Sequence, residues 1–311
     1  MEQKVTVIAT VFNEENSIES FLNSLCTQTR LPDEIVIVDG GSTDRTIELI
    51  KNFKFQISNF KLKIIIKKGN RSVGRNTAIQ NSSYDLIAIT DAGCIPHRDW
   101  LHQLLLAHKK TKAPVIAGYY DAKPKTHFEE AVIPYALVMP DRLNAQTFLP
   151  ATRSMMIEKK AWESLGGFDE SLYDNEDYAF AQKLKKNNIA IEFNKNAKVT
   201  WIPRSNIHGF IKMIYRFAKG DAYAGIFRPK VVFIFIRYLL GLALLAYILY
   251  SKNYLLFTIL YSLFLFYLLW AIFKNKHYVP HGWYYLPLLQ VVSDVAVISG
   301  TIKGIWDTQN R

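Results

Sequence analysis

At 311 residues the chain can form one sizeable α/β domain together with a second part, and its composition divides it in that way. Hydrophobic residues make up 50% of the sequence, and from Val231 onward Leu, Ile, Phe and Tyr dominate, so we expect a soluble part followed by a membrane part. The net charge of +11 suits contact with an anionic membrane surface and with phosphate groups. No run of Lys and Arg interleaved with aromatic residues occurs, which argues against a nucleic-acid-binding surface.

The cysteines and the start of the chain predict where the soluble part resides. Two cysteines, Cys26 and Cys94, are too few for a disulfide framework and fit a reducing compartment. The chain runs from Met1-Glu2-Gln3-Lys4 directly into an expected strand. We therefore expect no signal peptide and a cytoplasmic soluble part.

The N-terminal part alternates β-branched apolar runs with segments of helical spacing. Strands are expected over 5–11, 34–39, 62–67 and 86–91, and helices over 18–28, 45–53 and 75–81. Beyond them we expect a helix over 100–110, strands over 115–119 and 154–157, helices over 159–165 and up to 186, and edge strands over 189–193 and 197–201; the Pro-rich stretch 123–150 is looser. This alternation implies a parallel sheet with helices on both faces, and in such sheets ligands bind beyond the carboxyl ends of the strands.

Acidic and polar residues follow three of these strands. Asn13 and Glu14 follow the first strand, Asp39 ends the second, and Asp91 follows the buried run 86–89. We expect these side chains to gather at one edge of the sheet, where a carboxylate can hold a divalent cation against a phosphate or accept a ribose hydroxyl. The alternative for each acid is a cap on the next turn or helix.

Two further groups are candidates for the same site. Arg71 and Arg75 precede the Asp91 strand, where guanidinium groups can reach a base or a diphosphate; the alternative is a solvated helix face. Glu176 and Asp177 begin a later helix, where a carboxylate far in sequence from Asp91 can act as general base on a separate acceptor. The alternative there is a capping box.

Four motifs together resemble those of the family 2 glycosyltransferases of the GT-A fold, over roughly residues 4–225. They are Thr10-x-Phe12-Asn13-Glu14, Val38-Asp39-Gly40-Gly41-Ser42-Thr43-Asp44, Thr90-Asp91-Ala92-Gly93, and Gly166-Gly167-Phe168-Asp169-Glu170 followed by Glu176-Asp177. The resemblance implies an α/β, Rossmann-like mixed sheet and an inverting hexosyltransferase that uses a UDP- or GDP-linked sugar and a divalent cation, Mn²⁺ or Mg²⁺.

The same resemblance assigns roles to particular residues. Asp39 would bind the base or ribose, Asp91 would bind metal and diphosphate, and Asp177, with Glu176 beside it, would deprotonate the acceptor hydroxyl. The donor-binding residues it implies are Thr10, Phe12, Asn13, Glu14, Asp39, Gly41, Ser42, Arg71, Arg75 and Asp91.

The sequence departs from the family pattern at two places. The aspartate-x-aspartate motif is Asp91-Ala92-Gly93 here, so the second metal-binding acid is absent, and His208 is a candidate late ligand. The Gln/Arg-x-x-Arg-Trp motif of some processive members has no counterpart, since the nearest stretch, Tyr215 to Asp221, contains no Trp. This second departure favours transfer of one sugar over polymer synthesis.

The C-terminal part predicts membrane association. An amphipathic helix is expected near 206–220, at the end of a glycosyltransferase domain over 1–228. The membrane domain over 229–311 would hold spans at about 231–250 and 254–273, and a stretch at about 284–306 that is a third span or, as we favour, an interfacial helix. Arg216, Lys219 and Arg237 are expected on the acceptor or membrane side.

We therefore expect a multi-pass protein of the cell membrane, with a cytoplasmic catalytic domain that moves one sugar to a polyprenyl phosphate or lipid-linked saccharide. The alternatives are a non-catalytic nucleotide-sugar-binding membrane protein, a processive polysaccharide synthase and a nucleotidyltransferase. The joint presence of Asp39, Asp91 and Asp177 argues against the first. A nucleotidyltransferase would carry a Gly-rich basic loop after the first strand, where this chain has Phe12-Asn13-Glu14-Glu15.

Overall fold

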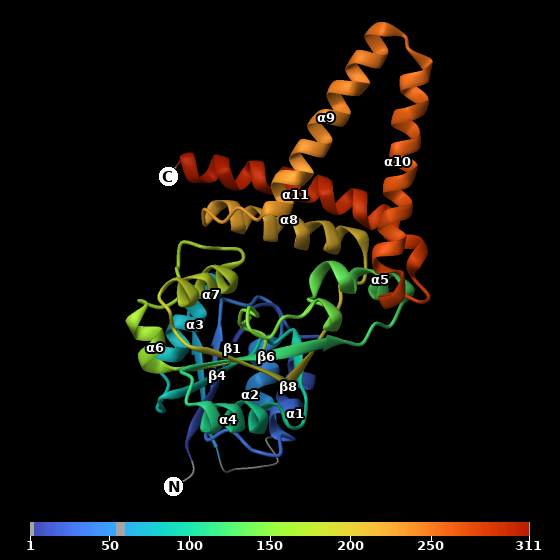
Figure 1. Cartoon of the computed structure of the whole chain (residues 1–311). Coiled ribbons are helices and arrows are strands. Elements are labelled where there is room, and N and C mark those ends of the chain that lie inside the picture. Colours follow the sequence, from blue (N-terminus) through green and yellow to red (C-terminus); the bar gives the residue numbers. More distant parts are fainter. Residues whose placement is uncertain (1–2, 54–59, 311) are drawn as a thin grey trace. The chain divides into compact units, whose positions relative to one another are not determined.

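The computed structural model describes residues 3–53 and 60–310 (Figure 1). Contacts within the chain divide it into two compact units, Met1–Lys123 with Met139–Ile202 and Pro124–Val138 with Pro203–Arg311. The second unit groups α8 (Ile207–Tyr223) with the apolar C-terminal helices. The boundary after residue 228 that hydropathy predicts stays a prediction about where the membrane part begins.

The first unit is built on an eight-stranded mixed sheet with strand order β3-β2-β1-β4-β7-β6-β8-β5. The strands are β1 (Val5–Val11), β2 (Glu34–Asp39), β3 (Lys61–Ile66), β4 (Leu86–Ile89), β5 (Cys94–Pro96), β6 (Val115–Ala122), β7 (Met155–Glu158) and β8 (Ile191–Trp201). β1, β2, β3 and β4 are mutually parallel, whereas β7 runs antiparallel to both β4 and β6. The mixed sheet implied by the family resemblance is confirmed, and the wholly parallel sheet implied by alternation alone is wrong.

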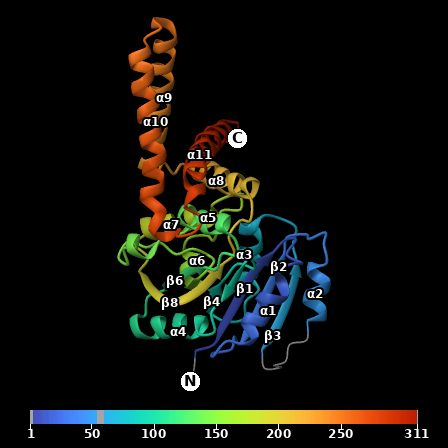
Figure 2. The same ribbon diagram turned by 90° about the vertical axis from the view of Figure 1, so that its right-hand side faces the viewer.

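The strands that carry the predicted site residues lie side by side. β1 lies between β2 and β4 (Figure 2), and all three are nearly continuous apolar runs because helices cover the sheet on both faces. The register pairs Val11 with Asp39 and Ile8 with Ile89. The carboxyl ends of β1, β2 and β4 therefore meet at one edge.

The prediction of two separate edge strands near residues 189–201 is wrong. They form one strand, β8, which pairs with β6 on one side and with the short β5 on the other. An irregularity between Ala117 and Tyr119 of β6 lets the pairing continue across Asn194 and Lys195, the polar residues that suggested a break.

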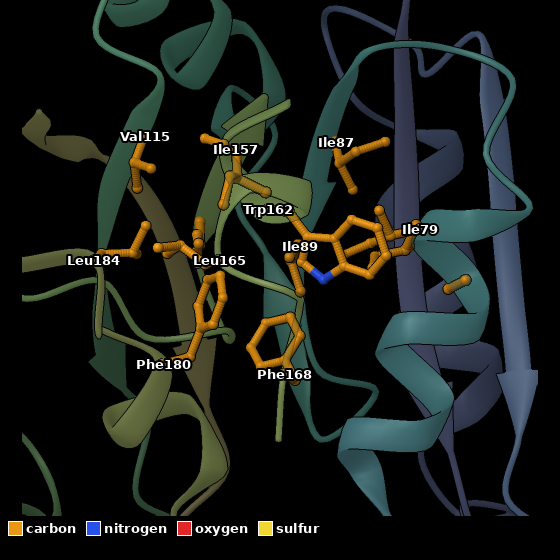
Figure 3. Packing of buried hydrophobic residues seen from close by; sticks show 14 of the residues in the cluster. Ile79, Ile87, Ile89, Val115, Ile157, Trp162, Leu165, Phe168, Phe180 and Leu184 are labelled. Atoms are coloured by element: carbon orange, nitrogen blue, oxygen red, sulfur yellow. The ribbon is translucent and has the colours of Figure 1, made fainter. Parts of the chain in front are cut away.

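Crossovers between parallel strands are right-handed as a rule, so the reversal of strand order after β3 puts α3 on the face opposite α1 and α2. The helices of this unit are α1 (Ile18–Cys26), α2 (Thr46–Asn52), α3 (Arg71–Gln80), α4 (Trp100–Thr111), α6 (Lys159–Ser164) and α7 (Glu176–Lys186), with a short 3₁₀ turn η1 (Pro140–Arg142). In Figure 3, Trp162 and Leu165 lie between residues of α3, α7 and the central strands. This core fixes α3 and α7, which carry the basic and acidic site residues, against the same sheet.

Two helices differ from the sequence-based expectation. α3 begins at Arg71 rather than Arg75, because the Asn70 side chain caps it by accepting a hydrogen bond from the Val73 N–H at 3.0 Å. Gly74 lets this first part of α3 pack closely against β1, because a Cβ at that position would lie only 2.7 Å from Thr10 Cγ2. The Pro-rich stretch contains a helix that the sequence did not predict, α5 (His127–Ala136), which the Thr126 side chain caps.

The second unit holds three helices that are long and apolar enough to cross a membrane. α9 (Pro229–Ser251) and α10 (Tyr254–Asn275) form an antiparallel pair, and an 18-residue stretch of each segment has a mean hydropathy of 2.4 and 2.3, respectively. Two short 3₁₀ turns, η2 (Lys276–Tyr278) and η3 (Trp283–Tyr285), lead to α11 (Leu286–Gln309), where the corresponding value is 1.5. The two predicted spans and the ambiguous third segment thus all form helices of spanning length.

α11 packs along α8 rather than along the α9–α10 pair (Figure 1, Figure 2). Gly300 and Gly304 allow the approach, because a Cβ at either position would overlap a backbone carbonyl of α8. The apolar face of α8, including Phe210 and Ile214, is buried in this unit, while Ile207 and Ile211 remain exposed. Much of the amphipathic face expected at a membrane surface is therefore covered by protein.

A buried carboxylate joins the three long helices. Asp294 of α11 accepts hydrogen bonds from Arg237 Nη2 at 2.6 Å and Tyr238 of α9 at 3.2 Å, and from the Tyr267 hydroxyl of α10. The Asp294 side chain is 1% exposed, and Gln290 also donates to it at 3.1 Å. Arg237 therefore pairs with an acid within the helix bundle.

Candidate active site

The loops after β1 and β2, residues 12–17 and 39–46, form one structure that we call the loop pair. The backbone N–H of Asn13 donates to Ser42 Oγ at 2.9 Å, and Asn13 Oδ1 accepts from the Thr43 N–H at 2.9 Å. Glu14 N–H donates to Thr46 Oγ1 at 2.8 Å. Asn13 adopts φ +55°, a conformation that Asn tolerates better than most residues. These bonds hold the first two strand ends in a fixed shape without any ligand.

Asp39 is the centre of the loop pair. Its Oδ1 accepts from the backbone N–H groups of Gly41 and Ser42, both at 2.8 Å, and its Oδ2 accepts from Ser42 Oγ at 2.5 Å. Gly41 has φ +100°, which disfavours residues with a side chain. Asp39 therefore shapes the turn that contains Gly41 and Ser42, and its contact with a nucleotide stays a prediction.

The other predicted donor-binding residues line the same edge. Thr10 is partly buried against Gly74 of α3, whereas the Phe12 ring is 58% exposed. Glu14 accepts from the Ser17 hydroxyl at 2.5 Å, so it also acts within its own loop. Arg71 is exposed in the first turn of α3. An exposed aromatic ring and an exposed guanidinium remain available to a ligand at this edge.

A second group, which we call the acid–arginine cluster, consists of Arg75, Asp91, Arg153, Glu176 and Asp177. Arg75 is its centre: Nη2 donates to Asp91 Oδ1 at 2.8 Å, and Nη1 donates to Glu176 Oε1 at 2.5 Å. The Arg75 and Glu176 side chains are each 2% exposed. Arg75, predicted to bind the donor, instead has two protein carboxylates as its immediate partners, and it joins Asp91 and Glu176, which lie 85 residues apart in sequence.

Asn76, which the sequence reasoning missed, docks the segment that leads to the second acid. Its Nδ2 donates to the Phe168 carbonyl at 2.8 Å and to Glu170 Oε1 at 2.9 Å. Its Oδ1 accepts from the Phe168 N–H at 2.9 Å and from Trp162 Nε1 at 3.2 Å. Gly167, at φ +75°, fits against the same amide, because a Cβ there would lie 2.8 Å from Asn76 Oδ1. The Gly-Gly-Phe motif therefore has a physical role in placing the start of α7.

Asp177 lies in the first turn of α7, after Asn175 with φ +58°. Burial raises the pKa of Asp177, and the negative charge of Glu176 raises it further against the opposing effect of Arg75. Asp91 has the opposite environment. Burial alone would raise the pKa of Asp91, but Arg75 and Arg71 outweigh it and hold that pKa below its ordinary range. Two carboxylates whose pKa values are pushed apart are a recurrent arrangement in enzymes that transfer protons.

The same residues offer few ligand atoms to a divalent cation. Within 3–53 and 60–310, no group of three or more His, Cys, Asp or Glu side chains is arranged to hold a metal ion. Asp91 is 35% exposed, and only its Oδ1 receives the Arg75 hydrogen bond. The chain therefore offers one carboxylate, which fits a cation whose remaining oxygen ligands come from a substrate diphosphate or water.

Four predicted residues belong to the second unit. His208, Arg216 and Lys219 are on α8, where Lys219 pairs with Asp307 of α11 at 3.1 Å; Arg237 is on α9. Their roles on the metal, acceptor or membrane side stay predictions.

Comparison with known proteins identifies the family. Residues 6–165 match the family model "Glycosyl transferase family 2", and residues 123–275 match "Glycosyl transferase family group 2". Glycosyltransferase AglE of Haloferax volcanii is 32% identical over 116 residues, which cover 37% of this chain and 38% of AglE. The chain thus spans well under half the length of that relative.

A second relative matches over a longer stretch. It is the dolichyl N-acetyl-alpha-D-glucosaminyl phosphate 3-beta-D-2,3-diacetamido-2,3-dideoxy-beta-D-glucuronosyltransferase of Methanococcus voltae, 26% identical over 70% of this chain and 73% of its own length.

One solved structure covers nearly the whole fold. The mannosyltransferase PcManGT from Pyrobaculum calidifontis, in complex with GDP-Man and Mn²⁺, has a TM-score of 0.70 at 17% identity, over 99% of this chain and 88% of that one. This likeness confirms the predicted GT-A fold. The family match supports the predicted class of enzyme, a glycosyltransferase. The chain belongs to glycosyltransferase family 2.

Proposed function

We propose that the protein is a membrane-bound, inverting glycosyltransferase that moves one sugar from a nucleotide-diphosphate sugar to a lipid-linked acceptor. The observation that carries this proposal is the Arg75 bridge, which brings the Asp91 segment and the Glu176-Asp177 segment together. An enzyme of this kind needs one carboxylate for the diphosphate side and another for the acceptor side. The acid–arginine cluster supplies both, with pKa values shifted in opposite directions.

The chemical step is a single in-line displacement at the anomeric carbon. The acceptor oxygen attacks that carbon as its proton passes to the Asp177 carboxylate, and the electron pair of the breaking carbon–oxygen bond leaves with the nucleoside diphosphate. The raised pKa of Asp177 makes it a stronger base than an ordinary aspartate. If the acceptor is a polyprenyl phosphate, its oxygen is already ionised and Asp177 orients it instead.

Donor recognition is assigned to the loop pair and its neighbours. Asp39 would accept from the base or ribose after a shift in its bonds to Gly41 and Ser42, and Phe12 would stack on an exposed face of the nucleotide. Arg71 would pair with the diphosphate. Thr10, Asn13 and Glu14 would line the rest of the donor-binding site. The donor would be UDP- or GDP-linked.

Asp91 would hold a divalent cation, Mn²⁺ or Mg²⁺, together with diphosphate oxygens. When bound, such a cation supplies positive charge that stabilises the leaving diphosphate. His208 remains a candidate additional ligand. Removal of the cation with EDTA should stop sugar transfer, and readdition should restore it.

The lipid-linked acceptor is supported by the apolar helices and by the long match to the Methanococcus voltae enzyme, whose name states a dolichyl-linked acceptor. We propose that α9 and α10 span the membrane, that α8 and α11 lie together at its cytoplasmic surface, and that the catalytic domain is cytoplasmic. Arg216 and Lys219 would face the acceptor or the lipid headgroups. Arg237, which pairs with Asp294, would help to hold the helices below an acceptor phosphate.

The test is nucleotide release by the full chain in detergent, from a panel of UDP- and GDP-sugars with Mn²⁺ or Mg²⁺ and a membrane lipid extract. Asp91→Ala and Asp177→Asn should each abolish lipid-dependent release from the one productive donor. The matched control is Asp85→Asn, an exposed acid at the opposite end of β4, which should release nucleotide like the wild type. The proposal would be overturned in favour of a non-catalytic binding protein if the chain binds a nucleotide sugar but releases nucleotide from no donor, and if Asp177→Asn leaves that binding unchanged.

A further inference from the structure

The turn Ala151–Ser154 precedes β7 and is held rigidly in the first unit. The Ser154 N–H donates to the Ala151 carbonyl at 3.0 Å. Ser154 Oγ accepts from Trp100 Nε1 at 2.9 Å and donates to the Ala197 carbonyl at 2.8 Å. Gly118 is required beside it, because a Cβ at that position would overlap Ser154 Oγ. The turn therefore presents Thr152 and Arg153 in one fixed position.

That position is next to the end of β4. The Thr90 hydroxyl donates to the Arg153 carbonyl at 2.9 Å, and Thr90 directly precedes Asp91. The guanidinium of Arg153 lies over the Tyr120 ring, 4.9 Å from its centroid. Arg153 thus belongs to the acid–arginine cluster, although no sequence motif pointed to it.

Polar atoms at this turn are buried without partners. Arg153 Nη1 and Thr152 Oγ1 have no hydrogen-bond partner within the described residues, and Thr152 is 1% exposed. Glu176 Oε2, in the same cluster, is also buried and unpartnered. Buried polar groups in folded proteins are normally paired, so two such atoms on adjacent residues of one fixed turn indicate that a polar ligand completes it.

Arg153 keeps its positive charge although it lies beside buried groups. Burial alone would lower the pKa of Arg153, but Cys94, Tyr120 and the carboxylates of Asp177 and Asp91 prevail and raise it. The guanidinium is therefore always charged. Its unpaired N–H group is free to donate to an oxygen anion, which is the partner that guanidinium geometry matches best.

We propose that Arg153, supported by Thr152, is a phosphate-binding residue of the active site. Its guanidinium donates to a phosphate oxygen at the point where donor and acceptor meet. This inference rests on the proposed transferase function, because that function brings phosphate to the cluster. The phosphate belongs either to the nucleoside diphosphate that leaves or to the lipid-linked acceptor.

The experiment separates these two sources in the full chain in detergent. Arg153→Gln, Arg153→Lys and Thr152→Val are compared for equilibrium binding of UDP and GDP, and for the KM of polyprenyl phosphate in mixed micelles. Loss of a charge-assisted hydrogen bond should weaken one of these two quantities about 10- to 100-fold in Arg153→Gln, with a smaller effect in Arg153→Lys. Weaker nucleotide binding assigns the phosphate to the donor, and a higher acceptor KM assigns it to the acceptor.

The control is Arg98→Gln, an exposed arginine of the same unit, which should leave both quantities unchanged. If Arg153→Gln folds poorly, Arg153→Lys and Thr152→Val carry the same comparison. Unchanged nucleotide affinity and acceptor KM in the folded Arg153 variants, with wild-type sugar transfer intact, would overturn the phosphate-binding role alone. Absence of transfer by the wild type would overturn the proposed function, while nucleotide binding would still report on Arg153.

Discussion

The loop pair and the acid–arginine cluster lie at the same edge of one sheet, but they differ in how their polar groups are satisfied. In the loop pair, Asp39 and Asp44 accept hydrogen bonds from neighbouring backbone N–H groups and hydroxyls. In the acid–arginine cluster, three acids and two arginines are crowded together, and Arg153 Nη1 and Glu176 Oε2 have no hydrogen-bond partner among residues 3–53 and 60–310. The loop pair is preformed, so that only the bonds of Asp39 to Gly41 and Ser42 would have to shift around a nucleotide, whereas the cluster contains buried polar atoms that its own residues leave unpaired.

The difference also concerns stability. Hydrogen bonds to ionised groups in the loop pair stabilise the fold, while the crowding that raises the pKa of Asp177 opposes it. Strain of this kind is commonly retained at functional sites. Four substitutions, ordered from the largest expected effect to the smallest, test whether the contrast holds.

Arg75→Met should have the largest effect. It leaves the buried carboxylate of Glu176 and that of Asp91 without their shared cation, and breaking a buried ion pair from one side costs roughly 3–5 kcal/mol. We expect a large fall in the Tm of the full chain in detergent, partly recovered in Arg75→Met/Glu176→Gln. Arg71→Met, an exposed arginine one turn earlier, should change stability by less than about 0.5 kcal/mol. Equal losses in the two single variants would contradict the central role of Arg75.

Asn76→Ala should have the next effect, because it removes an amide that makes three hydrogen bonds to the segment before α7 and one to Trp162 of α6. The buried polar groups of Phe168 and Trp162 would be left without a hydrogen-bond partner, which should lower the free energy of unfolding by about 2–3 kcal/mol in total. Since the segment places Asp177, sugar transfer should fall as well. The matched control is Asn81→Ala on the exposed C-terminal end of the same helix. A fall in Tm with unchanged transfer would separate stability from positioning.

The sequence predicts the strand-end acids well, because the apolar runs before Asp39 and Asp91 are unambiguous and parallel strands must bring their ends together. The sequence predicts poorly which side chains contact one another when they lie far apart in the chain. The bond between Arg75 and Glu176 spans 101 residues, and the anchoring of Arg153 by Thr90 spans 63. Local patterns carry no information on such pairs.

One local signal for Arg75 was nevertheless present. Ser72, Arg75 and Ile79 share one helical face with small or apolar residues, and all are buried. An arginine on such a face must find an acid inside the protein. The start of α3 was predicted four residues too late for a simpler reason. Gly69 and Asn70 are typical of a loop, and the sequence alone does not show that the Asn70 side chain caps the helix.

Asp44→Ala tests the loop pair itself. Although burial would raise the pKa of Asp44, hydrogen bonds from Thr46 and from the backbone prevail and lower it. The ionised acid therefore stabilises the fold at pH values above the ordinary aspartate pKa of ~3.9, and this stabilisation is lost as the pH falls toward the lower folded value. We expect Asp44→Ala to lower the Tm at pH 7, because the loop pair loses the hydrogen bonds that this carboxylate accepts. The difference in Tm from the wild type should shrink near pH 3, while Asp44→Asn should lose less at every pH.

Asp177→Asn should have the smallest effect on stability and the opposite sign. Because the folded pKa of Asp177 is raised, the wild type loses stability as the pH rises from the ordinary aspartate range through that folded pKa, and the asparagine variant does not. We expect the variant to have a higher Tm than the wild type at neutral pH, with the gap closing as the pH falls below the ordinary aspartate pKa of ~3.9. Parallel Tm profiles of wild type and Asp177→Asn between pH 3 and 8 would show that the cluster stores no electrostatic strain. If the Tm of Asp177→Asn rises above that of the wild type as the pH increases, while Asp44→Ala has a lower Tm, the two groups differ in sign. The acid of the loop pair then stabilises the fold, and the acid of the acid–arginine cluster destabilises it.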